Sequence, residues 1–307
     1  MRTRFRGVTV REGVLVQGPA GWGEFSPFLE YPPEVAAPWW RAAREAADDG
    51  WPEPLRSRVP VNVTVPAVSA EQAAAVVRAG RGCRTAKVKV AEPGQRLGDD
   101  QARLEAVRDA LGPDGHIRID VNGLWSRAEA LARIPVLDRA AGGLEYVEQP
   151  CASVEDLAAV RRGVDVRIAA DESIRRTADP YRVRDLDAAD VAVLKVQPLG
   201  GVRACLRIAA DIGLPVVVSS ALETSVGIAA GVALAAALPD LPFACGLATV
   251  QLLVDDVVLD PLLPVDGALP VRRPVPDPVA LARLAASPER AEHWRRRLAS
   301  IGQDHQA

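Results

Sequence analysis

Several features typical of secreted, membrane and nucleic-acid-binding proteins are missing from this chain of 307 residues. Its four cysteines lie far apart and form no Cys-x-x-Cys pair, so neither a disulfide framework nor a zinc site is expected. No apolar run approaches the ~20 residues of a membrane-spanning helix, and no apolar signal-peptide core follows the basic start. A net charge of −3 argues against a nucleic-acid-binding surface, which would need clustered basic charge. We therefore expect a cytoplasmic protein with no membrane and no nucleic-acid partner.

Lysine is scarce for a charged residue. Of 37 basic residues only three are lysines, Lys87, Lys89 and Lys195, and the remaining 34 are arginines. Arginine stays protonated in proteins, whereas a partly buried lysine can lose its proton near neutral pH. Unless codon bias alone left these three, the chain keeps lysine where its titration matters.

Apolar runs rich in Val, Ile and Leu recur from about residue 60 onward. They alternate with Ala-, Leu- and Arg-rich stretches of helical spacing, which is the pattern of parallel βα units. The runs show little in–out alternation, as in a closed barrel covered by helices. The expected fold class is therefore α/β, a (β/α)8-type barrel modified toward (β/α)7β. The linker after Asp179 is too short for a full helix, so we expect that unit to be abbreviated. The eight predicted strands are 61–65, 85–90, 117–121, 144–148, 167–171, 191–195, 215–219 and 242–246.

The two chain ends differ from this pattern, and we expect them to form one small α+β capping domain. Residues 3–10 and 13–17 are predicted to be a hairpin around a Glu12-Gly13 turn, and 38–48 and 278–298 are predicted helices. The predicted division is residues 1–58 for the N-terminal part of the cap, 59–255 for the catalytic barrel, and 256–307 for a C-terminal segment that packs back on the cap.

Three carboxylates end three successive predicted strands: Asp120, Glu148 and Asp171. The active site of a βα barrel lies at the carboxyl ends of its strands, so these side chains would converge. Their mutual repulsion calls for a cation, and ligands that are all oxygen favour Mg²⁺ over zinc. Each acid alone could instead cap a following helix, but three strands in a row favour a metal site.

The lysines flank this predicted metal site. Lys87 and Lys89 point to the same face of one strand, where two close ammonium groups depress each other's pKa so that one can act as a base. Lys195 arrives four strands further round, across the barrel mouth. A metal between opposed lysines suits proton abstraction next to a carboxylate, so a small-molecule carboxylate is the expected substrate.

Five motifs in this order resemble the enolase superfamily, and within it the muconate-lactonizing subgroup. They are Ala86-Lys87-Val88-Lys89, Ile119-Asp120-Val121-Asn122, Tyr146-Val147-Glu148-Gln149-Pro150, Ala170-Asp171-Glu172-Ser173 and Leu194-Lys195. The resemblance implies that the three carboxylates bind Mg²⁺, with Mn²⁺ as an alternative. It also implies that Lys89 is the general base, that Lys87 supports it, and that Lys195 lies on the opposite face of the substrate.

Segments 3–13, 21–28 and 218–225 are similar to dehydratases of this subgroup that act in menaquinone biosynthesis. This likeness implies a lyase that removes water from a hydroxylated cyclohexadiene carboxylate. It further implies an N-terminal loop that closes over the site. The substrate-binding residues it implies are Ser219, Ser220, Gly246 and Arg4. Asn122, Glu172 and Glu223 are expected behind the site, where the first two either orient a ligand or cap a helix.

Other functions stay open at this point. N-acylamino acid racemases also use opposed lysines, as do dipeptide epimerases, but an epimerase would carry Asp-x-Asp where residues 245–249 contain no acid. A racemase with a histidine base is not expected, because His116, His293 and His305 fall outside the predicted strand ends. A catalytically silent binding barrel would have lost one of the predicted metal ligands or lysines. All three carboxylates and all three lysines are present. The sequence does not fix the oligomeric state, and a monomer is compatible with it.

Overall fold

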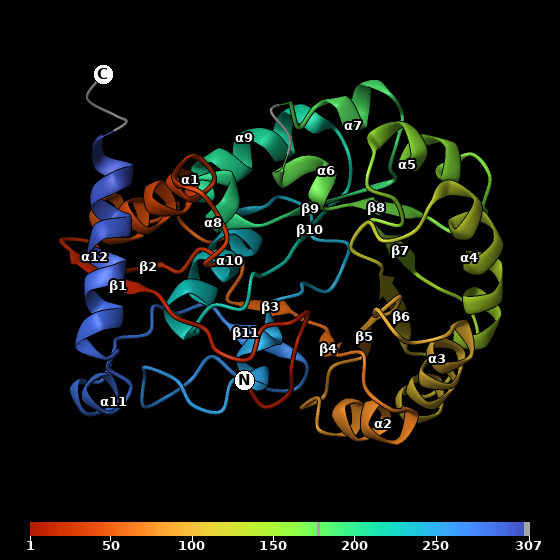
Figure 1. The fold of residues 1–307 in the computed structure, drawn as a ribbon, viewed down its shortest axis with the longest axis horizontal. Coiled ribbons are helices and arrows are strands. Elements are labelled where there is room, and N and C mark those ends of the chain that lie inside the picture. The colour runs from red at the N-terminus through yellow and green to blue at the C-terminus, as the bar shows by residue number, and fades with distance from the viewer. Residues whose placement is uncertain (177–178, 304–307) are drawn as a thin grey trace.

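The computed structural model describes residues 1–176 and 179–303, and its centre is a curled parallel sheet of seven strands (Figure 1). The spatial order β10-β9-β8-β7-β6-β5-β4 places every strand beside its neighbour in sequence. Successive βα units produce this order, because each connection returns the chain to the start of the next parallel strand. The strands are β4 (Val63–Val65), β5 (Thr85–Lys89), β6 (His116–Asp120), β7 (Tyr146–Glu148), β8 (Ile168–Ala170), β9 (Val191–Leu194) and β10 (Val216–Val218).

Helices cover the outer face of this sheet (Figure 1). In its described part, the connection after β8 has two one-turn helices, α6 and α7, and no full helix, as the short linker predicts. In the described ranges, no helix is both long enough and apolar enough to cross a membrane. The helices are α2 (Ala70–Arg78), α3 (Leu97–Leu111), α4 (Arg127–Ala141), α5 (Val154–Arg161), α6 (Glu172–Arg175), α7 (Arg182–Asp185), α8 (Val196–Leu199), α9 (Val202–Ile212), α10 (Ser225–Ala237) and the 3₁₀ turn η2 (Ala248–Leu252).

The eighth predicted strand, 242–246, closes the barrel through isolated bridges. Cys245 pairs with Val61 and Gly246 pairs with Ser219, both in parallel orientation. The buried Arg118 of β6 reaches across the barrel and donates to the Ala244 carbonyl oxygen at 2.6 Å. The segment therefore takes the eighth position of the barrel without forming a regular strand, in keeping with the expected fold class.

The predicted N-terminal hairpin is wrong in its strand pairing and in the position of its turn. The hairpin consists of β1 (Val14–Gly18) and β2 (Gly21–Phe25), and its turn lies at residues 19–20, not at Glu12-Gly13. Residues 3–10 hold only one isolated bridge, between Phe5 and Val8. The turn between the two strands ends at Gly21, whose φ of +133° is a conformation that glycine adopts freely and other residues rarely do.

Both chain ends contribute to the core of the cap. Phe25 packs in one cluster with Trp39 of α1 (Pro33–Arg44) and with Trp294 of the C-terminal helix α12 (Pro288–Gln303). In Figure 1, α12 lies alongside α1, away from the barrel sheet. The predicted helix 38–48 extends from α1 into a π-helical turn, η1 (Glu45–Asp49), and the predicted helix 278–298 is two helices, α11 (Pro278–Arg283) and α12.

A small antiparallel pair joins the cap region to the barrel. β3 (Arg58–Pro60) pairs with β11 (Ala268–Pro270), so the chain returns from the C-terminal side to the point where the barrel begins. The domain boundaries at residues 58 and 255 stay a prediction. The last four residues of the predicted C-terminal segment, 304–307, lie outside the described residues.

Candidate active site

Three of the predicted site residues are direct neighbours across the sheet. Lys89, Asp120 and Glu148 are the last residues of β5, β6 and β7. In the strand register, Lys89 lies opposite Asp120, and Asp120 lies opposite Glu148. Asp171 and Lys195 follow directly after β8 and β9, at the same edge of the sheet. The parallel register thus brings the polar strand ends to one place, as the sequence predicts.

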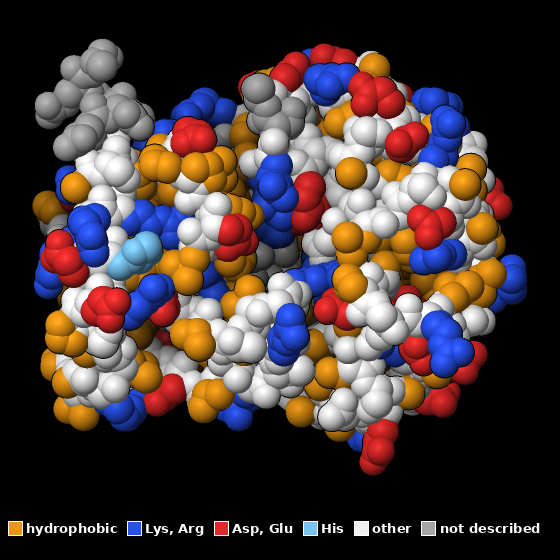
Figure 2. Space-filling model, in the orientation of Figure 1, with side chains coloured by type: hydrophobic (Ala, Val, Ile, Leu, Met, Phe, Trp, Pro, Cys, Tyr) orange, Lys and Arg blue, Asp and Glu red, His pale blue; other side chains and the backbone are white. Residues whose placement is uncertain are grey.

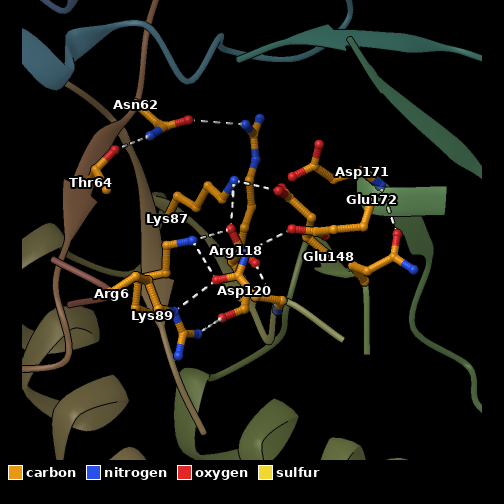
Figure 3. Close-up of polar contacts among 12 residues, drawn as sticks. Arg6, Asn62, Thr64, Lys87, Lys89, Arg118, Asp120, Glu148, Asp171 and Glu172 are labelled. Carbon is orange, nitrogen blue, oxygen red and sulfur yellow. Dashed lines mark hydrogen bonds and ion pairs between the residues drawn. The ribbon is translucent and has the colours of Figure 1, made fainter. Parts of the chain in front are cut away.

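Each carboxylate of this group accepts a hydrogen bond from a lysine. Figure 3 shows the contacts that Lys87 and Lys89 make with Glu148 and Asp120. Lys87 Nζ lies 2.6 Å from Glu148 Oε1 and 2.9 Å from Asp120 Oδ2. Lys89 Nζ lies 2.6 Å from the same Asp120 oxygen, and all four side chains are buried. Because these charges have been removed from water, they depend on one another for stabilisation.

Asp171 is held from three sides. Lys195 Nζ lies 2.6 Å from its Oδ2, and Arg175 Nε lies 2.7 Å from its Oδ1. Gln149 accepts a hydrogen bond from the Asp171 backbone N–H at 2.9 Å and so fixes the loop that carries the carboxylate. The Arg175 guanidinium lies close enough to hold the pKa of Asp171 below its usual range, even though burial acts in the opposite direction.

The two lysines of β5 differ in their electrostatics. Burial lowers the pKa of Lys89, and although the Asp120 carboxylate opposes this, the Lys87 ammonium adds to the lowering. Burial alone would also lower the pKa of Lys87, but its contacts with Asp120 and Glu148 raise that pKa well above its ordinary value. These opposite pKa shifts favour Lys89 as the lysine that can be neutral, and Lys87 as a fixed positive charge.

Among the described residues, no three Asp, Glu, His or Cys side chains stand in a metal-binding arrangement. The carboxylates of the site are instead paired with lysines and with Arg175. The donor set nevertheless fits a hard divalent cation. Glu148 Oε2 is buried and accepts no hydrogen bond, which is unusual for a buried polar atom. Burial, together with the nearby Asp120 carboxylate, raises the pKa of Glu148 to about 7. A cation at this point would provide the missing partner and counter-charge.

A cavity of about 280 Å³ opens above these residues. On the face shown in Figure 2 the surface is hollowed near its middle, where charged side chains gather. The three lysines line the cavity together with Asp120, while Glu148 and Asp171 do not line it and are fully buried. The other residues that line it are Phe5, Arg6, Val8, Phe28, Glu30, Tyr31, Trp39, Thr64, Asn122, Glu172, Arg175, Arg176, Pro198, Ser219, Ser220, Ala221, Leu222, Gly246 and Thr249.

Three of the four predicted substrate-binding residues line this cavity: Ser219, Ser220 and Gly246. Ser220 shares a hydrogen bond of 2.8 Å with Thr249, which ties the turn after β10 to η2. The fourth residue, Arg4, lines a smaller neighbouring cavity instead. Arg6, two residues later, is the arginine of the N-terminal segment that reaches the main cavity.

The residues expected behind the site fall into two groups. Asn122 accepts a hydrogen bond from Lys89 Nζ at 2.8 Å and donates one to Glu172 Oε1 at 3.2 Å. Asn122 and Glu172 therefore both belong to the lysine–carboxylate network. Glu223 is buried behind the cavity, where its carboxyl accepts from the Ala221 backbone N–H. It therefore supports the turn after β10 and makes no contact with the lysines.

Sequence reasoning missed the contributions of Arg175, Gln149 and Arg6. Arg175 lies four residues after Asp171, a spacing that brings two side chains together on a helix and was available as a signal. Gln149 stands between Glu148 and Pro150 in a motif that was noted without a role. The contact of Arg6 with Asn122, 116 positions later, leaves no local signal. Of the histidines, His116 begins β6 and His293 lies on α12, whereas His305 is outside the described residues.

The sequence matches two family models. The model of enolase C-terminal domain-like proteins matches residues 69–276, and that of enolase N-terminal domain-like proteins matches residues 1–47. Among known proteins, the o-succinylbenzoate synthase of Thermobifida fusca is 65% identical over 98% of this chain and 93% of its own length. The o-succinylbenzoate synthase of Mycolicibacterium smegmatis is 58% identical over 96% of this chain and 90% of its own length.

Solved structures share the fold at lower identity. Muconate cycloisomerase from Pseudomonas fluorescens superimposes with a TM-score of 0.75 at 22% identity, over 89% of this chain and 97% of that one. The L-Ala-D/L-Glu epimerase from Bacillus subtilis superimposes with a TM-score of 0.71 at 23% identity, over 85% of this chain and 88% of that one. At such identities these likenesses establish the architecture only.

Proposed function

Because the chain belongs to the enolase superfamily and, within it, to the o-succinylbenzoate synthases, we propose that it dehydrates 2-succinyl-6-hydroxy-2,4-cyclohexadiene-1-carboxylate to o-succinylbenzoate in menaquinone biosynthesis. One observation carries this proposal: Lys89 and Lys195 face a single cavity from β5 and from the end of β9, with buried carboxylates beneath them. The four cysteines are free and buried, which agrees with a reducing cytoplasm as the site of the reaction.

Family membership implies a divalent metal, and we propose Mg²⁺, with Mn²⁺ as an alternative, held by Asp120, Glu148 and Asp171. The orphaned Glu148 Oε2 and the purely oxygen donor set support this assignment. When bound, the cation supplies positive charge beside the carboxylate of the substrate.

In the proposed reaction, Lys89 removes and then returns one proton. Its neutral Nζ takes the proton from C1 of the substrate, next to the carboxylate, and the electron pair of that C–H bond becomes part of an enolate. The enolate then forms the C1–C6 double bond as the C6–O bond breaks. The departing hydroxide takes the proton from Lys89, which leaves an aromatic ring, one water molecule and neutral Lys89.

The other residues stabilise charge and orient the substrate. Lys87, which is paired with Asp120 and Glu148, keeps a positive charge next to Lys89 and thereby favours its neutral form. Lys195 stabilises the enolate from the opposite face through its charge and through a cation–π contact with the forming ring. Ser219, Ser220 and the backbone at Gly246 line the cavity at the ends of β10 and of the eighth barrel segment, where we place the succinyl tail.

Ultraviolet absorbance of the purified protein with Mg²⁺ and the cyclohexadiene carboxylate tests this function. We expect rapid, Mg²⁺-dependent loss of the diene absorbance by the wild type and no loss by Lys89→Arg, which cannot supply a neutral base. An unchanged diene signal with the wild type contradicts the proposal. Exchange of the α-proton of N-acylamino acids in D₂O would then point to the racemase alternative.

A further inference from the structure

A strained turn carries the N-terminal segment into the active-site cavity. Phe5 and Val8 form two backbone hydrogen bonds with each other, of 3.0 and 2.9 Å, around Arg6 and Gly7. Both turn residues have positive φ angles, +49° for Arg6 and +84° for Gly7. Glycine adopts this conformation freely, but arginine does so at a cost, and such positions are often maintained for function.

The turn directs the Arg6 guanidinium at the ends of β5 and β6 (Figure 3). Its nitrogens donate to Asn122 Oδ1 at 2.8 Å and to Glu92 Oε2 at 3.0 Å. They also donate to the backbone oxygens of Val90, at 2.9 Å, and of Asp120, at 3.3 Å. The planar fork of an arginine can bind several acceptors in fixed directions, whereas a lysine cannot.

Asn122 connects Arg6 to the proposed base. Its Oδ1 accepts from both Arg6 Nε and Lys89 Nζ, at 2.8 Å each, while its Nδ2 donates to Glu172. These partners fix the amide with its oxygen toward Lys89. The neighbouring Phe5 ring lies 5.2 Å from Lys89 Nζ and covers it on another side. We infer that Arg6 is a positioning residue for Lys89, which it orients through Asn122.

This inference rests on the proposed function, because it assigns Arg6 to the proton-transfer step. A misplacement of about 1 Å can slow an enzymatic step by about 100-fold. We therefore expect Arg6→Gln to lower kcat by roughly 10- to 100-fold while KM changes little. With substrate deuterated at C1, the isotope effect on kcat should rise, because proton abstraction then limits turnover. Arg6→Lys should behave like Arg6→Gln, since it keeps the charge but loses the fork.

A double-mutant cycle with Asn122→Gly tests the connection. Glycine suits the positive φ of +54° at this position, so the variant removes the amide without adding backbone strain. If Arg6 acts through Asn122, the double variant should lose no more kcat than the more damaging single variant. Arg2→Gln is the matched control, because it removes an exposed arginine from the same segment and should leave kcat unchanged.

The outcomes separate this inference from the proposed function. Additive losses of kcat, full activity of Arg6→Lys, or an effect on KM alone would overturn the role of Arg6 while the wild type still dehydrates the diene. A wild type without dehydration activity overturns the proposed function and, with it, the assignment of Arg6 to the reaction. In that case the same four proteins are compared by thermal unfolding without metal or substrate. Non-additive changes in stability would show that the Arg6 and Asn122 side chains are coupled, and additive changes would show that they are not.

Discussion

We expect Glu223, for which no contact with the lysines is found, to make the stability of this protein depend on pH. Its carboxyl is buried behind the turn after β10, and burial together with the neighbouring Glu24 raises its pKa from 4.5 to about 7. A Cβ atom at Gly227 would lie 2.6 Å from the Glu223 Cβ and 2.9 Å from Glu24 Oε2, so both acids converge on this glycine. Arg11 acts in the opposite direction on the pKa of Glu223 without cancelling the rise.

The sign of the effect follows from the direction of the shift. Because the folded state raises the pKa, it holds the proton more tightly than the unfolded state does. The stabilisation from this group is complete below pH 4.5 and is lost as the pH rises through about 7. The difference between these two pKa values corresponds to about 3 kcal/mol. Glu223→Gln removes the titration and should abolish this part of the pH dependence.

Urea unfolding of the wild type and of Glu223→Gln between pH 4.5 and 8.5 measures the difference directly. We expect the free energy of unfolding of the wild type, relative to the variant, to fall by about 3 kcal/mol across this range. Glu105→Gln, which removes an exposed glutamate from α3, is the control and should show no such trend. A difference between wild type and Glu223→Gln that stays the same at every pH would refute the reasoning.

Three further predictions follow from the site and the barrel. Lys89→Arg should abolish turnover with an unchanged circular dichroism spectrum, because arginine stays protonated; a rate near that of the wild type would rule out Lys89 as the base. Removal of divalent cations by a chelator should abolish turnover, and Mg²⁺ or Mn²⁺ should restore it; activity that survives chelation would contradict the metal assignment. Arg118→Leu should lower the free energy of unfolding by about 3 kcal/mol, because it leaves Glu145 and the Ala244 carbonyl without their buried partner. A urea midpoint equal to that of the wild type would show that the eighth barrel segment does not need this contact.

The alternation of strands and helices, and the residues that end each strand, were available from the sequence because both are local properties. An apolar run predicts a buried strand, and its last polar residue must lie at the carboxyl edge of a parallel sheet. Lys89, Asp120 and Glu148 were therefore placed together correctly without any knowledge of their contacts.

Tertiary structure decided the features that depend on contacts between distant parts of the chain. The sequence could not show that Lys87 binds two carboxylates while Lys89 binds one, because both lysines face the same side of one strand. Nor could the sequence show whether Arg4 or Arg6 reaches the main cavity, since only the fold of the turn directs Arg6 at Asn122. Periodicity determines which side chains share a face, whereas pairing, charge and cavity shape arise only when separate elements meet.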